Sequence, residues 1–116
     1  FIITAGRAAD YPPVYGKIDE ICMKMQEDYN KSLTVSHYAD LCNLSESRFA
    51  HLFKEKCGIS PKKYITKIKI STALNLLTDS DLPLAEISSI VGFEDYNYFC
   101  RIIKKETGLS PSCFRK

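Results

Sequence analysis

The sequence lacks long apolar runs and has few residues that interrupt helices. Its longest uninterrupted apolar segments are only a few residues long, as at residues 1–3, so none can form a transmembrane helix. It opens without the basic, apolar and small-residue pattern of a signal peptide and gives no argument for secretion. Glycine and proline number five each among 116 residues, which leaves room for helices, and 45% of the residues are hydrophobic. We therefore expect an ordered, mainly helical protein that does not enter a membrane.

The cysteines do not form the pattern of a disulfide framework or a zinc site. They are five in number, an odd count, and no Cys-x-x-Cys pair occurs among them. We expect them to be reduced thiols in a reducing compartment, the cytoplasm. His37 has no further ligand at zinc spacing, so we expect it at the surface. The sequence predicts neither a metal site nor a cofactor.

The sequence also lacks a convincing catalytic pair. Cys57 and His51 are a cysteine and a histidine close together in the chain, six residues apart. Six residues along a helix place two side chains about 240° apart, on different sides. We therefore predict that the protein is not an enzyme.

Charge is distributed unevenly along the chain. The formal net charge is +2, but residues 1–43 carry −2 and residues 44–116 carry +4. A basic region of this kind is compatible with a polyanionic partner, although many helical domains share it.

Apolar residues at helical spacing divide the chain into helices with defined ends. Ser45 is a predicted N-cap for a helix that Gly58 ends, and Ser60-Pro61 opens a long helix. From these signals we predict an all-α fold of two helix-turn-helix subdomains joined by a long linker helix. The expected segments are a tail from an upstream region (1–16), the first subdomain (17–60), the linker helix (61–78) and the second subdomain (79–116), with the first helix beginning at Lys17.

The second part of the chain repeats the first. Residues 35–44 align with 84–93 at an offset of 49, and residues 45–64 align with 95–114 at an offset of 50. Five positions are identical under the second offset, namely Phe49/Phe99, Lys54/Lys104, Gly58/Gly108, Ser60/Ser110 and Pro61/Pro111. Two copies of a short helix, a tight turn and a capped second helix predict a duplicated helix-turn-helix.

The second helix of each copy has one apolar side and one polar side. Phe49, Leu52 and Phe53 share the inward side of the helix at about 46–57, as Phe99, Ile102 and Ile103 do at about 96–107. The outward positions are Ser47, Ala50, His51 and Lys54 in the first copy and Asn97, Cys100, Arg101 and Lys104 in the second.

These outward faces suit the major groove of DNA. A helix placed there contacts base edges with its first turns and phosphates with later basic side chains. Arg101 has the donors for a bidentate contact with guanine, and Asn97 matches adenine. His51 and Ser47 are weaker readers, so we expect the second copy to discriminate bases more sharply. We expect phosphate contacts from Arg48, Lys54, Lys104 and Lys105.

The linker helix is long enough to place these two helices in successive grooves. About 17 residues span roughly 25 Å at about 1.5 Å per residue, and the helix widths extend this toward one DNA turn of roughly 34 Å. Because a helix is stiff, we expect either the protein to yield slightly or the DNA to bend.

Residues from about 17 to 116 resemble the DNA-binding domain of the AraC/XylS family of bacterial transcription regulators. The similarity is strongest over residues 87–111, which follow the family pattern I-A-x-x-x-G-F-x-D-x-x-Y-F-x-R-x-F-K-K-x-x-G-x-S-P nearly position for position. The sequence departs from this pattern at Ser88 and Ile103, where the family has alanine and phenylalanine. Upstream of the pattern, Lys69 stands where the family usually has arginine. We expect Ser88 to loosen helix packing.

The resemblance implies a fold of about seven helices in two subdomains that binds double-stranded promoter DNA. It implies a regulator, often an activator that contacts RNA polymerase, with a separate effector or dimerisation domain that we expect to be missing from this sequence. The family's base-contacting positions correspond to Ser47, Ala50, His51, Tyr96, Asn97 and Arg101. Ala50 offers only a methyl group, which suits thymine.

One alternative is a helical protein-interaction module that contacts the transcription machinery. Tyrosine is enriched at protein interfaces, and Tyr96 and Tyr98 are placed to serve one. Under this alternative, DNA binding is incidental. If the two tyrosines are only structural, we expect Tyr98 partly in the core and Tyr96 at the rim of the helix.

Overall fold

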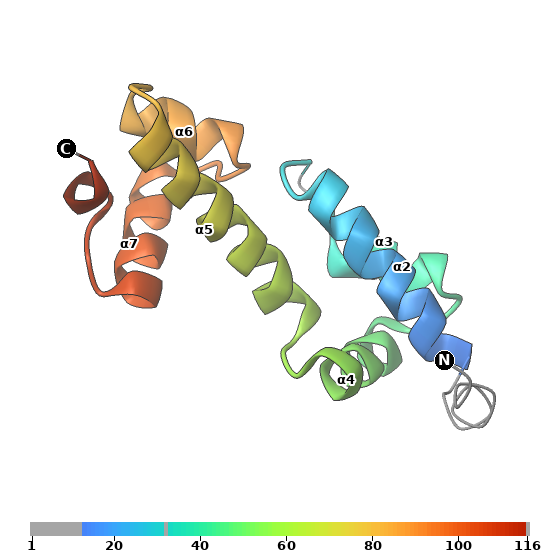
Figure 1. Cartoon of the computed structure of the whole chain (residues 1–116). Coiled ribbons are helices and arrows are strands. Elements are labelled where there is room, and N and C mark those ends of the chain that lie inside the picture. Colours follow the sequence, from blue (N-terminus) through green and yellow to red (C-terminus); the bar gives the residue numbers. More distant parts are fainter. Residues whose placement is uncertain (1–12, 32, 116) are drawn as a thin grey trace, which may run out of the picture. The chain divides into compact units, whose positions relative to one another are not determined.

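The computed structural model describes residues 13–31 and 33–115. Within them the chain forms six α-helices and one short 3-10 helix, without a β-strand, which confirms the predicted all-α class. The elements, shown in Figure 1, are α2 (Pro13–Asp28), α3 (Val35–Leu41), α4 (Glu46–Cys57), α5 (Pro61–Asp79), α6 (Leu84–Ile90), α7 (Tyr96–Thr107) and the 3-10 helix η1 (Pro111–Phe114).

The first described helix begins earlier than the sequence predicted. We expected a tail over residues 1–16 and a helix from Lys17, but α2 begins at Pro13. Proline is favoured at the first position of a helix, because its fixed φ suits the helix and its missing N–H is not needed there. Gly16 obscured this start because glycine disfavours a helix interior. The rest of the expected tail, residues 1–12, lies outside the described residues.

The chain folds into two compact units. Among the described residues, unit 1 comprises 13–27 and 33–64, and unit 2 comprises 28–31 and 65–115. Helix α5 is therefore divided between them, its first turn belonging to unit 1 and the remainder to unit 2.

The element bounds reproduce the repeat in the sequence. Helices α3 and α6 are separated by the offset of 49, and α4 and α7 by the offset of 50. Gly58 and Gly108 end α4 and α7 in the left-handed conformation, with φ of 86° and 85°. The two predicted recognition helices, about 46–57 and 96–107, coincide with α4 and α7.

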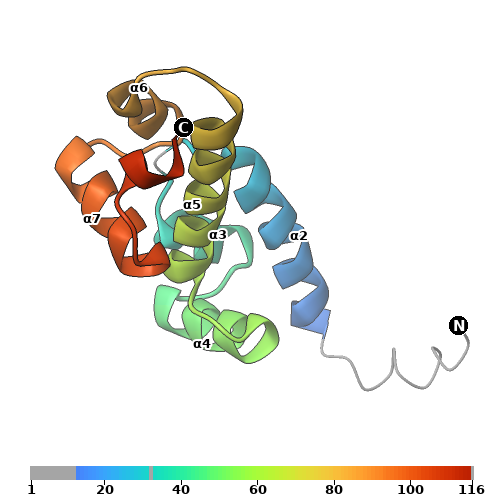
Figure 2. The ribbon, with the colours of Figure 1, turned by 60° about the vertical axis from the view of Figure 1, so that its left-hand side comes forward.

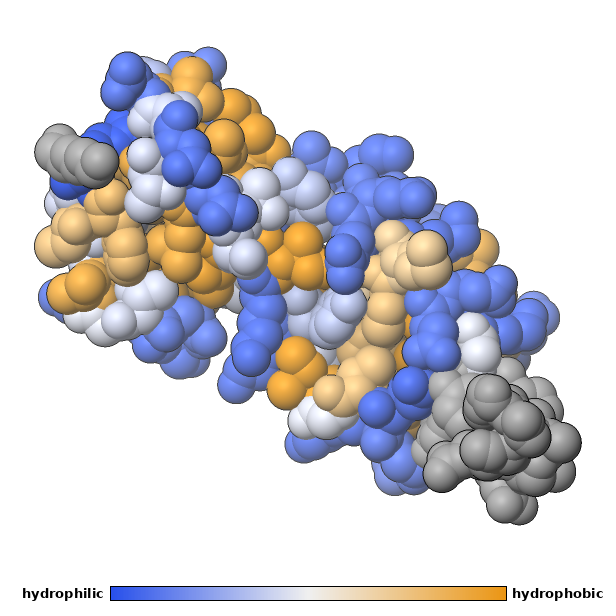
Figure 3. All heavy atoms as spheres, in the orientation of Figure 1, coloured by the Kyte–Doolittle hydropathy of each residue, from blue (hydrophilic) through white to orange (hydrophobic). Residues whose placement is uncertain are grey.

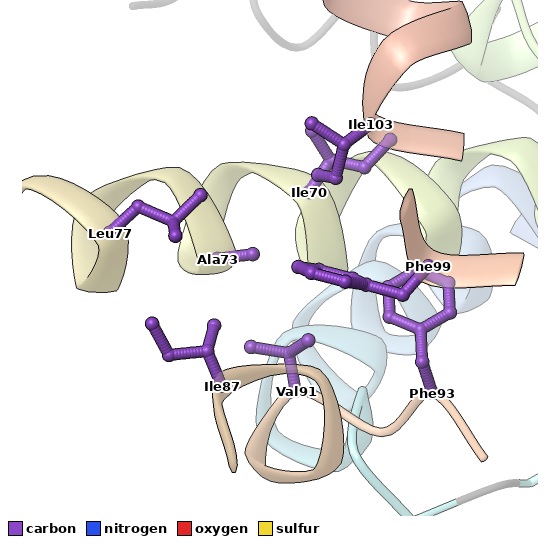
Figure 4. Packing of buried hydrophobic residues seen from close by; sticks show 8 residues of the cluster. All are labelled: Ile70, Ala73, Leu77, Ile87, Val91, Phe93, Phe99 and Ile103. Carbon is purple, nitrogen blue, oxygen red and sulfur yellow. The ribbon is translucent and has the colours of Figure 1, made fainter. Parts of the chain in front are cut away.

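Apolar side chains of α5, α6 and α7 form the core of unit 2. Figure 2 shows α6, α7 and η1 grouped around the second part of α5, and Figure 4 shows the side chains between them. The buried cluster consists of Ile70, Ala73, Leu77, Ile87, Val91, Phe93, Phe99 and Ile103. Phe99 and Ile103 are fully buried, which fixes the side of α7 that faces the core.

Aromatic rings hold α4 in unit 1. Phe49 and Phe53 are fully buried, with ring centroids 5.7 Å apart. Phe53 in turn contacts the edge of Tyr64, 5.5 Å away, in the first turn of α5. The inward face of α4 is therefore the apolar side predicted from its sequence.

Candidate nucleic-acid interface

Helix α4 is capped at both ends and presents a polar face. The Ser45 hydroxyl accepts a hydrogen bond from the backbone N–H of Arg48 at 3.1 Å, which satisfies a donor at the helix start. Ser47, His51 and Lys54 are exposed, and Ala50 is half-buried beside them. The predicted outward face of α4 is therefore accessible.

Helix α7 begins with a stronger cap. A carboxylate oxygen of Asp95 accepts hydrogen bonds from the backbone N–H groups of Asn97 at 2.9 Å and Tyr98 at 3.4 Å. Because Asp95 fixes the first turn, it also sets the direction in which Tyr96 and Asn97 point. Both of these side chains are exposed, as is Arg101 one turn further along.

One position on α7 differs from the predicted faces. Cys100 was expected outward but is half-buried against the unit 2 core, as is Ile102, which was expected inward. The inward direction is centred between Phe99 and Ile103, and at 100° per residue Cys100 and Ile102 lie at similar angles on either side. The polar face of α7 is therefore formed mainly by Asn97, Arg101 and Lys104.

Intrahelical contacts orient the strongest base-reading candidate. The Arg101 guanidinium carbon lies 5.8 Å from the ring centroid of Tyr98, one turn earlier on α7. Such a contact restrains a long side chain and leaves its donors free for another partner. Tyr98 contacts Phe93 at 6.0 Å between centroids and remains 40% exposed, so it lies at the edge of the core.

Tyr96 and His51 also have partners on their own helices. A hydrogen bond with Cys100 raises the pKa of the Tyr96 hydroxyl, with smaller contributions from burial and the Cys100 thiol. The His51 Nε2 atom lies 3.7 Å from Glu55 Oε2, one turn along α4. The sequence patterns did not identify Glu55 or the contact between Tyr98 and Arg101, although the i,i+4 and i,i+3 spacings could have indicated both.

The predicted phosphate contacts lie on accessible parts of the same helices. Arg48, Lys54, Lys104 and Lys105 are all exposed. Lys54 is in the last turn of α4, and Lys104 and Lys105 are in the last turn of α7. Each helix thus carries positive charge in its last turn, and α4 carries Arg48 in its first turn as well.

Lys69 of α5 supports the turn before α7. Its Nζ donates a hydrogen bond to the Gly92 carbonyl at 3.2 Å and lies 5.2 Å from the centroid of the Phe93 ring. Burial lowers the Lys69 pKa, and Glu94 partly opposes this effect. The sequence identified Lys69 only as a departure from a family pattern, whereas the structure shows that it connects α5 to the α6–α7 turn.

The surface also carries apolar groups outside these faces. On the side drawn in Figure 3, apolar areas lie between hydrophilic ones. Large apolar side chains exposed in the described residues are Met23, Leu41, Ile90, Tyr96, Tyr98 and Leu109. No described helix is both long and apolar enough to cross a membrane, and the described residues contain no cluster of three or more His, Cys, Asp or Glu suited to a metal ion.

Two short helices, each followed by a capped helix with an exposed polar face, define this fold as a duplicated helix-turn-helix. Residues 38–116 match the family model described as a helix-turn-helix domain. The chain belongs to this family of DNA-binding domains, and its relatives are transcription regulators of the AraC/XylS type.

Comparison with individual proteins supports the same assignment. The chain is 36% identical over 106 residues to the arabinose operon regulatory protein of Escherichia coli K12, a match that covers 90% of this chain and 36% of the relative. The chain therefore spans about a third of that relative's length. The C-terminal domain of AraT, a response regulator from Geobacillus stearothermophilus, has 30% identity and a TM-score of 0.80, covering 90% of this chain and 84% of that one.

A third comparison concerns the fold alone. The DNA-binding domain of the transcriptional factor AdpA, solved in complex with a target DNA, has a TM-score of 0.80 at 21% identity. That match covers 84% of this chain and 88% of the AdpA chain.

Proposed function

We propose that this chain binds double-stranded promoter DNA with α4 and α7 in two successive major grooves. The observation that carries the proposal is the equivalence of the two helices. Both are capped at both ends, bury an aromatic side chain at the same repeat position (Phe49 and Phe99) and expose polar and basic residues opposite it. A single helix with a polar outer face can simply be exposed to solvent. Two such faces at equivalent positions of the repeat favour a ligand whose shape also repeats, such as double-stranded DNA.

Base recognition is assigned to the exposed first turns. In α7, Asn97 and Arg101 carry the side chains best suited to adenine and guanine, and Tyr96 lies beside them. In α4, Ser47 and His51 each supply a single hydrogen-bonding group, and Ala50 supplies a methyl group. We therefore expect a stricter base preference at the base pairs that α7 contacts than at those that α4 contacts.

Phosphate contacts from Arg48, Lys54, Lys104 and Lys105 supply affinity without sequence information. Their exposure on the same helices supports this role, because phosphates border the groove that each helix enters. The proposed DNA complex therefore combines salt-dependent affinity with base discrimination located mainly in unit 2.

The regulatory setting is proposed from the relatives. The arabinose regulator is much longer than this chain, which is consistent with an additional effector or dimerisation domain in the whole protein. We propose that the protein is a cytoplasmic regulator without enzymatic activity, and that it activates transcription through contact with RNA polymerase. The alternative function of the α7 face is to bind a protein. Tyr96 and Tyr98 are exposed there, and tyrosine is enriched at protein interfaces.

Selection from a random DNA pool, followed by mobility shift at two salt concentrations, tests the proposal. We expect enrichment of one bipartite motif with half-sites about one helical turn apart, and affinity that falls steeply with salt. Enrichment of a single half-site would contradict the two-groove arrangement. No retention of any DNA at low salt would contradict DNA binding and favour the protein-docking alternative.

A further inference from the structure

Two thiols in unit 1 lie within contact distance although they are far apart in the sequence. Cys22 Sγ on α2 and Cys57 Sγ at the end of α4 are 3.7 Å apart. Both side chains are half-buried, and all five cysteines of the chain are free thiols. This pair is the one sulfur–sulfur contact among them in the described structure.

Contacts near the pair hold α2 beside the end of α4 and the start of α5. Lys56 Nζ, next to Cys57, forms an ion pair with Asp19 of α2 at 3.2 Å. One turn beyond Cys22, the Gln26 side-chain amide donates a hydrogen bond to the Tyr64 hydroxyl at 3.3 Å. The two sulfur atoms are therefore brought together by contacts that do not depend on the thiols themselves.

A covalent bond requires the two sulfur atoms to approach from 3.7 Å. A disulfide needs a sulfur–sulfur distance of roughly 2.05 Å, and rotation about the Cα–Cβ bonds of two partly accessible side chains can supply the approach. Cys57 precedes Gly58, whose left-handed conformation ends α4, so the bond would join the end of this helix to α2.

We propose that Cys22 and Cys57 form a reversible disulfide by exchange with a small-molecule disulfide. The thiolate of one cysteine attacks a sulfur of the small disulfide and releases one small thiolate, forming a mixed disulfide. The second cysteine, as its thiolate, attacks the protein sulfur of that mixed disulfide, forms the Cys22–Cys57 bond and releases the second small thiolate. The two protons lost by the protein protonate these leaving groups, so the protein is oxidised by two electrons and the small disulfide is reduced to two thiols.

The surroundings of Cys22 slow its reaction with disulfides at neutral pH. Burial, followed by the neighbouring Cys57 thiol, raises the pKa of Cys22 to about 11. Few Cys22 thiolates therefore exist at neutral pH, so exchange at this thiol is slow unless the small disulfide is in excess or the pH is raised.

Titration of the folded chain with mixtures of oxidised and reduced glutathione tests the proposal. Free thiols are then blocked with N-ethylmaleimide and peptides are mapped by mass spectrometry without reduction. We expect two of the five thiols to disappear, a Cys22–Cys57 cross-linked peptide to form, and dithiothreitol to restore all five. We also expect the thermal midpoint of the oxidised form to exceed that of the reduced form.

Matched variants separate this pair from general thiol oxidation. Cys100→Ser and Cys113→Ser should still lose two thiols, whereas Cys22→Ser and Cys57→Ser should form no intramolecular cross-link. Glutathione adducts on single cysteines alone, or cross-links that involve Cys42, Cys100 or Cys113 instead, would overturn the proposal. The wild-type peptide map decides this even where a serine variant fails to fold.

Discussion

Gly92 lies against the backbone of Asn30, so that a Cβ placed on Gly92 would be 2.9 Å from Asn30 Cα. Gly92 also has φ of +92°, a conformation that L side chains rarely adopt. The contact brings the segment after α2 against the α6–α7 turn within unit 2. The turn that positions α7 therefore depends on a glycine for two separate reasons.

Gly92→Ala should destabilise unit 2 by about 2–4 kcal/mol, because it adds a backbone clash to the cost of a positive φ. Gly108→Ala is the matched control, since Gly108 has φ of +85° and open space around its Cα. It should cost only about 1 kcal/mol. Urea unfolding followed by circular dichroism measures both, and equal losses would show that the clash with Asn30 is unimportant.

Phe99→Ala should destabilise unit 2 by about 3–5 kcal/mol, because Phe99 is fully buried in its core. Lys105→Ala on the same helix is the control, because exposed substitutions usually change stability by at most about 0.5 kcal/mol. Urea unfolding provides the comparison. Unchanged stability of Phe99→Ala would contradict the burial of this ring.

Helix ends were predictable where a local residue determines them. Ser45 and Gly58 are capping types at their positions, and the bounds of α4 follow from them. The same reasoning failed at Pro13, because Gly16 weakened the helical pattern just after it. Residue type also did not reveal the turn at Asn43. This residue adopts a left-handed backbone with φ of 57° at the position where the second copy has Gly92.

Contacts between distant segments were beyond prediction from the sequence. The repeat located the exposed face of α7, but not the hydrogen bond from Lys69 to the Gly92 carbonyl or the proximity of Cys22 to Cys57. These depend on how helices pack, and helical periodicity indicates only that a face is buried. Half-buried positions such as Cys100 were also misassigned. A helical-wheel projection divides residues into an inward and an outward side, whereas burial varies continuously around the helix.

Raising the pH from 9 to 11 should destabilise unit 1. The pKa of Cys22 is raised from 9.0 to about 11 on folding, so between these values the folded state retains a proton that the unfolded state has lost. Stability therefore falls with rising pH in this window, by about 1 kcal/mol after allowance for solvent screening. Urea unfolding of wild type and Cys22→Ala across this range measures the effect, and an identical pH dependence of the two proteins would contradict this assignment.

Lys54→Ala should weaken binding to all DNA sequences by similar factors and reduce the salt dependence by about one ion. Lys54 is exposed at the end of α4 and is proposed to contact phosphate. Mobility shifts on the selected site and on unrelated DNA, each over a series of salt concentrations, measure both quantities. A loss confined to the selected site would instead indicate that Lys54 reads bases.

Arg101→Ala should weaken binding to the selected site by about 1–3 kcal/mol and relax its preference at one or two base pairs. Arg101→Lys is the discriminating control, because it keeps the charge but lacks the planar fork that makes a bidentate contact with guanine. We expect Arg101→Lys to lose the same base preference while retaining more affinity for unrelated DNA than Arg101→Ala. Competition between the selected site and single-base variants measures this preference. If Arg101→Ala lowered affinity equally on every sequence, Arg101 would be a phosphate contact, and base reading by α7 would have to come from Asn97 and Tyr96.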